Sequence, residues 1–226
     1  MSSVAEEWIR WIAGLAPRER DAAVEERLGI AVPTPDAAPG EHLIGYHPSG
    51  VAPIVRALAA VPVRREDVLV DLGSGLGKVV LLAALLTGVR AQGVELQPEL
   101  ARSARAAAGR LGVPASFSTG DARTVPLDEG TVFFLYVPFV GPVLDAVLER
   151  LRHVASSRPI VVCALGVDLD HASWLTRRPL DDFWLAIYDS VTARPLVPPA
   201  FSPYLETAVE AVAFERPWER FGSPGA

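Results

Sequence analysis

A glycine-rich segment between two apolar runs constrains the fold of this chain more than any other feature of its sequence. Residues 68–70 are Val-Leu-Val, residues 71–78 are Asp-Leu-Gly-Ser-Gly-Leu-Gly-Lys, and an uninterrupted apolar run covers 79–86. A short β-branched run that ends in glycines indicates a buried strand, and the longer apolar run after them indicates a helix. Because parallel strands need such a crossover between them, this segment predicts a parallel sheet.

The same alternation of strand and helix patterns continues over most of the chain. Two β-rich runs, 183–191 and 207–215, are expected to close the sheet as a C-terminal antiparallel hairpin. The prediction is an α/β fold, a Rossmann-like seven-stranded mostly parallel sheet with helices on both faces. Its other strands are expected at 90–96, 115–119, 131–137 and 159–165, and its helices at 51–60, 98–111 and 143–154.

The N-terminal region has a different pattern. Residues 4–28 carry apolar and charged side chains at helical spacing and are interrupted by Pro17, which predicts two helices. Residues 31–40 contain three prolines and a glycine, which predicts a loop. We therefore divide the chain into an N-terminal helical extension with a Pro-rich loop, 1–45, and a main domain, 46–226.

Composition excludes several classes of function. Cys163 is the single cysteine among 226 residues, so an intramolecular disulfide and a cysteine-rich zinc site are excluded, and the four histidines lack metal-ligand spacing. The net charge of −6 argues against a nucleic-acid partner bound through its phosphates. These counts and spacings lead us to expect no metal. Because no apolar run approaches the roughly 20 residues that span a bilayer, we also expect a cytoplasmic protein with no membrane partner.

The register of the glycine-rich segment discriminates between ligands. A phosphate-binding P-loop would require glycine in place of Leu72 and serine or threonine in place of Val79, so such a site is excluded. A dinucleotide-binding turn would require a small residue in place of Lys78, so an NAD site stays as a weaker alternative. Lys78 itself is open between a solvated residue of the helix's first turn and a functional residue.

Acidic residues stand at the ends of the first three strands that the pattern predicts. They are Asp71, Glu95 and Asp121, separated by 24 and 26 residues. Because open α/β sheets bind ligands at the carboxyl ends of their strands, we expect the three carboxylates to line one ligand. Asp71 would attract an ammonium or sulfonium group, Glu95 would accept hydrogen bonds from a ribose, and Asp121 from an adenine amino group. S-adenosylmethionine carries all three features.

These segments resemble the cofactor motifs of the class I S-adenosylmethionine-dependent methyltransferases. The resemblance rests on the DLGSGLG turn, the acid of GVEL and the triplet Gly120-Asp121-Ala122, and it covers roughly residues 46–165. It implies a methyltransferase whose cofactor is S-adenosylmethionine. The residues of these motifs that it implies as cofactor contacts are Asp71, Gly73, Ser74, Gly75, Gly77, Glu95, Leu96, Asp121 and Ala122.

A second, local resemblance lies upstream. The segment Tyr46-His47-Pro48-Ser49, 22 residues before Asp71, is similar to the Tyr-x-x-Thr turn of the non-SET histone lysine methyltransferases, as is GSGLGKVVLLAA to their glycine-rich turn and helix. It implies that Tyr46 and Ser49 contact the methionine part of the cofactor. The likeness does not extend to lysine specificity, because FLYVPF has Tyr136 where that family and the amino-group methyltransferases commonly carry Asn or Asp.

The chemistry of methyl transfer requires mainly that the acceptor be held in line with the methyl group and shielded from water. Tyr136 is expected at the end of the fourth strand, where it would contact the cofactor and orient the acceptor. His47 is expected to act as a base where the acceptor must lose a proton. The methyl acceptor, a small molecule or a protein side chain, and the oligomeric state are not identified by these residues.

Two other functions stay open. A non-catalytic module that binds S-adenosylmethionine and regulates a partner would carry the same cofactor motifs, and an NAD-dependent oxidoreductase is the weaker alternative. The N-terminal helices, which contain Trp8 and Trp11, are hypothesised to form a lid over the acceptor pocket.

Overall fold

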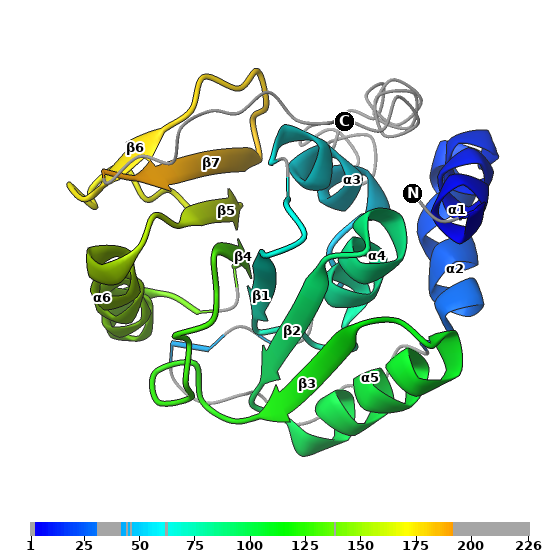
Figure 1. Ribbon diagram of the computed structural model, residues 1–226, viewed down its shortest axis with the longest axis horizontal. Helices are drawn as coiled ribbons and strands as arrows, with labels where there is room; N and C mark the ends of the chain where they lie inside the picture. Colours follow the sequence, from blue (N-terminus) through cyan, green and yellow to red (C-terminus); the bar gives the residue numbers. More distant parts are fainter. Residues whose placement is uncertain are drawn as a thin grey trace, which may run out of the picture.

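The chain folds into a central sheet with helices on both sides (Figure 1). The computed structural model describes residues 3–30, 42, 43, 45, 47–61, 63–137 and 139–191. In chain order its elements are α1 (Ser3–Gly14), α2 (Pro17–Leu28), α3 (Val51–Ala60), β1 (Val68–Leu72), α4 (Lys78–Thr87), β2 (Arg90–Glu95), α5 (Pro98–Leu111), β3 (Ala115–Thr119), β4 (Val132–Tyr136), α6 (Gly141–Ser157), β5 (Val161–Leu165), β6 (Leu175–Arg177) and β7 (Leu185–Ser190).

The sheet has the order β3-β2-β1-β4-β5-β7-β6, with β1 in its middle. Neighbouring strands from β3 to β5 are parallel, and β7 is antiparallel to both β5 and β6. The α/β fold with a C-terminal antiparallel hairpin is thereby confirmed. The hairpin partner of β7 is the three-residue β6, which the sequence pattern does not predict. The run 207–215, which was expected in that place, lies outside the described residues.

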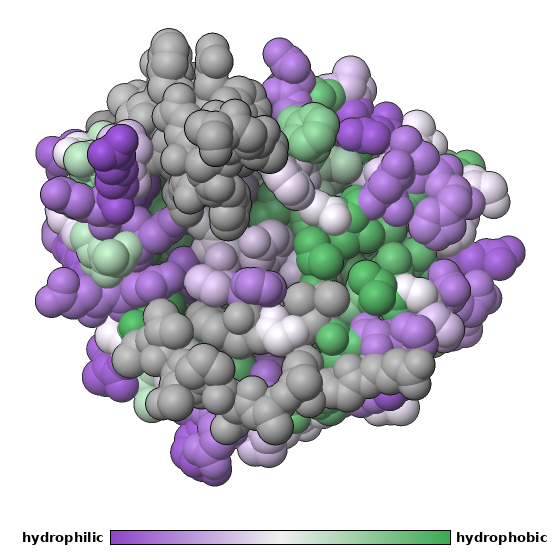
Figure 2. All heavy atoms as spheres, turned by 180° about the vertical axis from the view of Figure 1, so that it is seen from behind, coloured by the Kyte–Doolittle hydropathy of each residue, from purple (hydrophilic) through white to green (hydrophobic). Residues whose placement is uncertain are grey.

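Alternate residues of the buried strands enter two hydrophobic clusters on opposite faces of the sheet. On β4, Phe134 belongs to the cluster shared with α1 to α5, whereas Phe133 belongs to the cluster shared with α6. This period of two follows from the strand geometry, which directs successive side chains to opposite faces. Seen from behind, the molecular surface carries a group of apolar residues to the right of its centre, with polar residues toward both edges (Figure 2).

The N-terminal helices form an outer layer on α4. Trp8, Ile12 and Val24 are buried in the same cluster as the apolar side of α4. Arg27 of α2 lies over the rings of Trp8 and Trp11, with its guanidinium carbon 4.3 and 4.4 Å from the two ring centroids. This cation–π contact joins α1 to α2. The expected domain boundary at 45 and 46 stays a prediction, because Tyr46 lies outside the described residues.

No helix in the described part of the chain is both long enough and apolar enough to cross a membrane.

Candidate functional site

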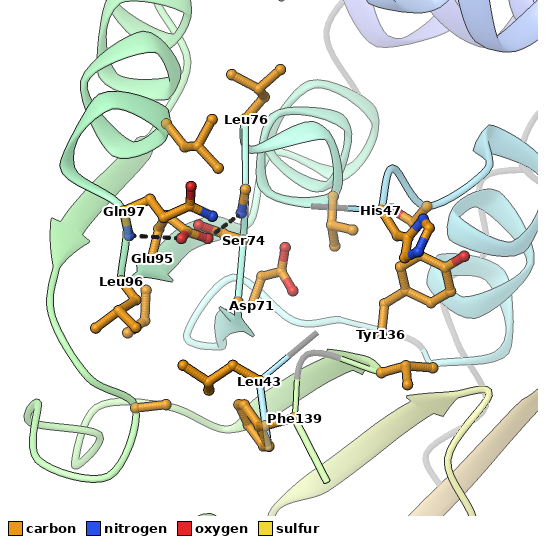
Figure 3. A pocket seen from close by; sticks show the side chains of 18 of the residues that line it. Leu43, His47, Asp71, Ser74, Leu76, Glu95, Leu96, Gln97, Tyr136 and Phe139 are labelled. Carbon is orange, nitrogen blue, oxygen red and sulfur yellow. Dashed lines mark hydrogen bonds between the residues drawn. The ribbon is translucent and has the colours of Figure 1, made fainter. Parts of the chain in front are cut away.

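A cavity of about 380 Å³ lies at the carboxyl ends of β1, β2 and β4 (Figure 3). Its floor comes from the strand ends and the glycine-rich turn, and one wall comes from the segment that precedes α3. Tyr46 lies outside the described residues, and Gly77, the residue before α4, does not line the cavity. The other residues predicted from sequence all line the cavity, namely His47, Ser49, Asp71, Gly73, Ser74, Gly75, Glu95, Leu96, Asp121, Ala122 and Tyr136.

Asp71 ends β1 with its carboxylate directed into the cavity (Figure 3). The residue is only 3% exposed, and its carboxylate makes no hydrogen bond or ion pair with another described residue. Burial first, and the neighbouring carboxylate of Glu95 second, raise the pKa of Asp71 to about 8. Burying an ionised carboxylate is unfavourable unless a ligand supplies a hydrogen-bond donor or a positive charge to it. The cavity therefore suits a ligand that brings a cationic donor to Asp71.

Glu95 ends β2 and holds the glycine-rich turn in place. Its Oε2 accepts a hydrogen bond from the backbone N–H of Gly75 at 2.8 Å, and its Oε1 accepts one from Gln97 at 2.8 Å (Figure 3). Each carboxylate oxygen has two acceptor positions, so Glu95 can still accept a hydrogen bond from a ligand hydroxyl. The side chain thus has a structural role in the turn, and its contact with a ribose stays a prediction.

The glycine-rich turn needs its glycines for two physical reasons. Gly73, Gly75 and Gly77 all have left-handed backbone angles, with φ of 84°, 53° and 82°, which cost little for glycine alone. At Gly77 an added Cβ would also lie 2.5 Å from the ring of Phe117. The turn leaves the hydroxyl of Ser74 buried at the cavity without a hydrogen-bond partner among the described residues, and such a group fits a polar ligand.

The far end of the cavity contains Leu96, Asp121 and Ala122. The backbone N–H and guanidinium of Arg123 donate hydrogen bonds to the carboxylate of Asp121, with the backbone bond at 2.8 Å. These side-chain hydrogen bonds are the main reason that the pKa of Asp121 is lowered. An ionised acceptor beside apolar Leu96 and Ala122 suits a flat base that carries an amino group.

His47 and Tyr136 lie together at the opposite end, across Asp71 from Glu95 (Figure 3). Leu43 and Phe139 form a β-bridge nearby, and His42 accepts a hydrogen bond from the backbone N–H of Val140 at 3.0 Å. This pairing brings the segment before α3 against the segment after β4. Sequence reasoning missed Leu43, whose only signal is its place close to the Tyr46–Ser49 motif.

The sequence did not predict the backbone conformation of Val137 or the ion pair of Lys78, two further residues of the site. Val137, directly after Tyr136, lines the cavity with a positive φ of 35°, a strained conformation for a β-branched residue. Lys78 is buried and paired with Glu25 of α2, so it is not a solvated residue of the first turn of α4.

A family model and several solved structures match parts of this chain. The family model described as "Histone methylation protein DOT1" matches residues 50–112, which run from the start of α3 to the end of α5. The match covers less than half of the chain. A search of curated proteins found none that matches this chain.

Solved structures match over a longer part. A structure described as an RNA methyltransferase from Salinibacter ruber in complex with S-adenosyl-L-homocysteine is 26% identical, with a TM-score of 0.50, and the alignment covers 69% of this chain and 100% of that one. A structure described as a SAM-dependent methyltransferase from Aquifex aeolicus is 12% identical, with a TM-score of 0.48, over 61% of this chain and 88% of that one. The resemblance to the class I methyltransferases predicted from sequence is confirmed.

Proposed function

We propose that this chain, which has the fold of the class I S-adenosylmethionine-dependent methyltransferases, uses that cofactor to methylate an acceptor that enters beside Tyr136 and His47. The observation that carries the proposal is the buried carboxylate of Asp71, which has no hydrogen-bond or ion-pair partner among the described residues. A ligand with an ammonium group and a positively charged sulfur stabilises the ionised form of this carboxylate, whereas a pyrophosphate would be repelled by that form.

The cavity offers a partner for each part of the cofactor. Asp71 and the buried Ser49 would hold the methionine part, together with Tyr46. Glu95 would accept from the ribose hydroxyls, and Asp121 from the adenine amino group. When bound, S-adenosylmethionine supplies a methyl group on a sulfonium, which is already activated for displacement.

The protein's own contribution is to place the acceptor and to remove its proton where required. Tyr136 carries a hydroxyl that can orient the acceptor, and His47 has an imidazole that can take a proton. Leu43, Phe139 and Val143 supply apolar surface at the cavity, which limits the access of water to the reacting atoms.

Calorimetry with S-adenosylhomocysteine and with NAD tests the cofactor. We expect S-adenosylhomocysteine to bind and NAD to give no heat of binding, because its pyrophosphate would meet Asp71 and Glu95. Tight binding of NAD without binding of S-adenosylhomocysteine would overturn the proposal in favour of the oxidoreductase.

Labelled methyl transfer tests the acceptor. The chain is incubated with S-adenosylmethionine labelled on its methyl group and with separate panels of small metabolites, proteins and RNA. We expect label in a small molecule or a protein side chain, because the net charge of −6 disfavours RNA. Label in RNA would contradict this choice of acceptor, and binding without any labelled product would favour a non-catalytic module.

A further inference from the structure

Two carboxylates of helix α2 contact the first residues of α3 and α4, the helices that follow cavity-lining segments. Asp21 and Glu25 are four residues apart, so they lie on one face of α2. The Oδ1 of Asp21 accepts a hydrogen bond from the backbone N–H of Val51 at 2.7 Å, and Glu25 forms an ion pair with the ammonium of Lys78. These are contacts between residues 30 and 53 positions apart in the chain.

Both partners are the first residues of helices that follow directly on cavity-lining segments. Val51 begins α3 after the segment 47–49, and Lys78 begins α4 after the glycine-rich turn. Neither helix is capped by the side chain of the residue that precedes it, because that residue is glycine in both cases, Gly50 and Gly77. The N-terminus of a helix leaves N–H groups unpaired and carries a partial positive charge. Asp21 therefore satisfies a backbone N–H at the start of α3, whereas Glu25 holds the first residue of α4 through the ammonium of its side chain.

The ion pair lies in a largely water-free place. The side chain of Lys78 is 5% exposed and that of Glu25 is 16% exposed. Val24 and Leu28, on either side of Glu25 along α2, are buried in the same cluster as Val79 and Val80. Removing one member of a buried ion pair leaves an uncompensated charge, so the surrounding elements shift to hydrate it. Any such shift at Lys78 moves the end of the glycine-rich turn.

We propose that Asp21 and Glu25 are positioning residues for the cofactor, which hold the starts of α3 and α4 at the separation that the cofactor cavity requires. The proposal rests on the proposed function, because the cavity must bind S-adenosylmethionine for its width to matter. It makes α2 a part of the binding site, although neither acid lines the cavity.

The primary test compares Glu25→Gln with Glu26→Gln. Glu26 is the next residue on α2 and is exposed, so it is a matched control. Affinity for S-adenosylhomocysteine is measured by calorimetry at a temperature at which circular dichroism shows every variant folded. We expect Glu25→Gln to weaken binding about tenfold, a usual size for coupling between two sites, and Glu26→Gln to leave it unchanged. A purely structural Glu25 would lower Tm without changing this affinity.

A double-mutant cycle tests whether Glu25 acts through Lys78. In a Lys78→Met background, Glu25→Gln is expected to cause no further loss of affinity, because the partner through which it acts is absent. Asp21→Asn is expected to weaken binding in both backgrounds, since its partner is the backbone of Val51.

The outcomes separate this proposal from the proposed function. Absence of binding in the wild-type chain would overturn the proposed function and this proposal with it. Wild-type binding together with equal affinities for Glu25→Gln and Glu26→Gln would overturn the positioning role of Glu25 alone, as would full additivity with Lys78→Met.

Discussion

The buried carboxylate of Asp71 makes the stability of the ligand-free protein depend on pH. In the folded chain its pKa is raised to about 8 by burial and by Glu95, whereas the ordinary value is 3.8. Between these values the folded state holds the proton and the unfolded state does not. The stability contributed by the protonated acid is therefore complete below pH 3.8 and is lost as pH rises through about 8.

The change Asp71→Asn tests this linkage. Without ligand, we expect the variant to have a higher Tm than the wild type at pH 7 and a similar one near pH 4, because asparagine has no proton to lose. Each 1 kcal/mol corresponds to roughly 2–4 °C for a chain of this length. The same change should weaken binding of S-adenosylhomocysteine by about 1–3 kcal/mol, through loss of a charge-assisted hydrogen bond. A lower Tm at pH 7 with unchanged affinity would contradict both expectations.

The affinity for the cofactor should rise with pH, whereas the stability of the ligand-free protein falls. The ammonium group of S-adenosylhomocysteine favours ionised Asp71, so binding must remove the proton that the ligand-free site holds below pH 8. We expect affinity to rise by up to about tenfold per pH unit between pH 6 and 8 and to level off above. Calorimetry in buffers of different ionisation enthalpy measures the released proton. Asp71→Asn should abolish the slope, whereas Asp128→Asn, a change at an exposed acid, should keep it.

At the scale of the elements, β2 and β3 are packed too closely at one point to accept a side chain. An added Cβ at Gly93 would lie 2.6 Å from Ser74 Oγ and closer still to the ring of Phe117. We expect Gly93→Ala to destabilise the protein by about 1–3 kcal/mol, as overpacking usually does. Denaturant unfolding measures the loss.

Gly109 provides the control for that change. It lies within α5 and an added Cβ there would meet nothing within 4 Å. Gly109→Ala should stabilise the protein by about 0.5–1 kcal/mol, because alanine loses less backbone entropy in a helix. Equal effects at the two glycines would show that Phe117 yields and that the packing at Gly93 is not tight.

Local patterns predict the elements where those patterns are strong. The limits of α3, α5 and β3 agree with expectation, since Pro98 begins α5 and glycines end several helices. Helix α6 begins before the expected 143–154, because Gly141 and Pro142 form its first turn, and it also continues beyond 154 to Ser157. Strand β6 is missed because three residues at an exposed edge carry no period and gain their structure from pairing with β7.

In the candidate site, too, local sequence predicts some residues, and helix packing determines others. Asp71, Glu95 and Asp121 could be placed from sequence, since strand ends in a parallel sheet converge on one edge. The pairs Glu25–Lys78 and Asp21–Val51 could not, because they depend on how α2 packs against α3 and α4. No local pattern specifies that packing, because α2 is mostly polar and buries only Arg20, Val24 and Leu28.

At the scale of the whole molecule, the N-terminal helices belong to the same hydrophobic cluster as one face of the sheet. Ile9 and Leu28 are buried there together with Leu69 of β1 and Val132 of β4. The hypothesis of a lid over the acceptor pocket requires these helices to separate from α4 during the reaction cycle. Their separation would expose this apolar surface and break the ion pair between Glu25 and Lys78, which opposes it.

Native-state hydrogen exchange distinguishes a lid from an integral layer. We expect the amides of α2 to open with the same free energy as those of β1, because a shared core unfolds as one cooperative unit. Amides of β6, where Thr176 and Arg177 are exposed at the sheet edge, should exchange much faster and serve as the internal control. Fast exchange confined to α1 and α2, with β1 still protected, would favour the moving lid. In that case the affinity measured for Glu25→Gln would report the closed population of the lid instead of a fixed cavity wall.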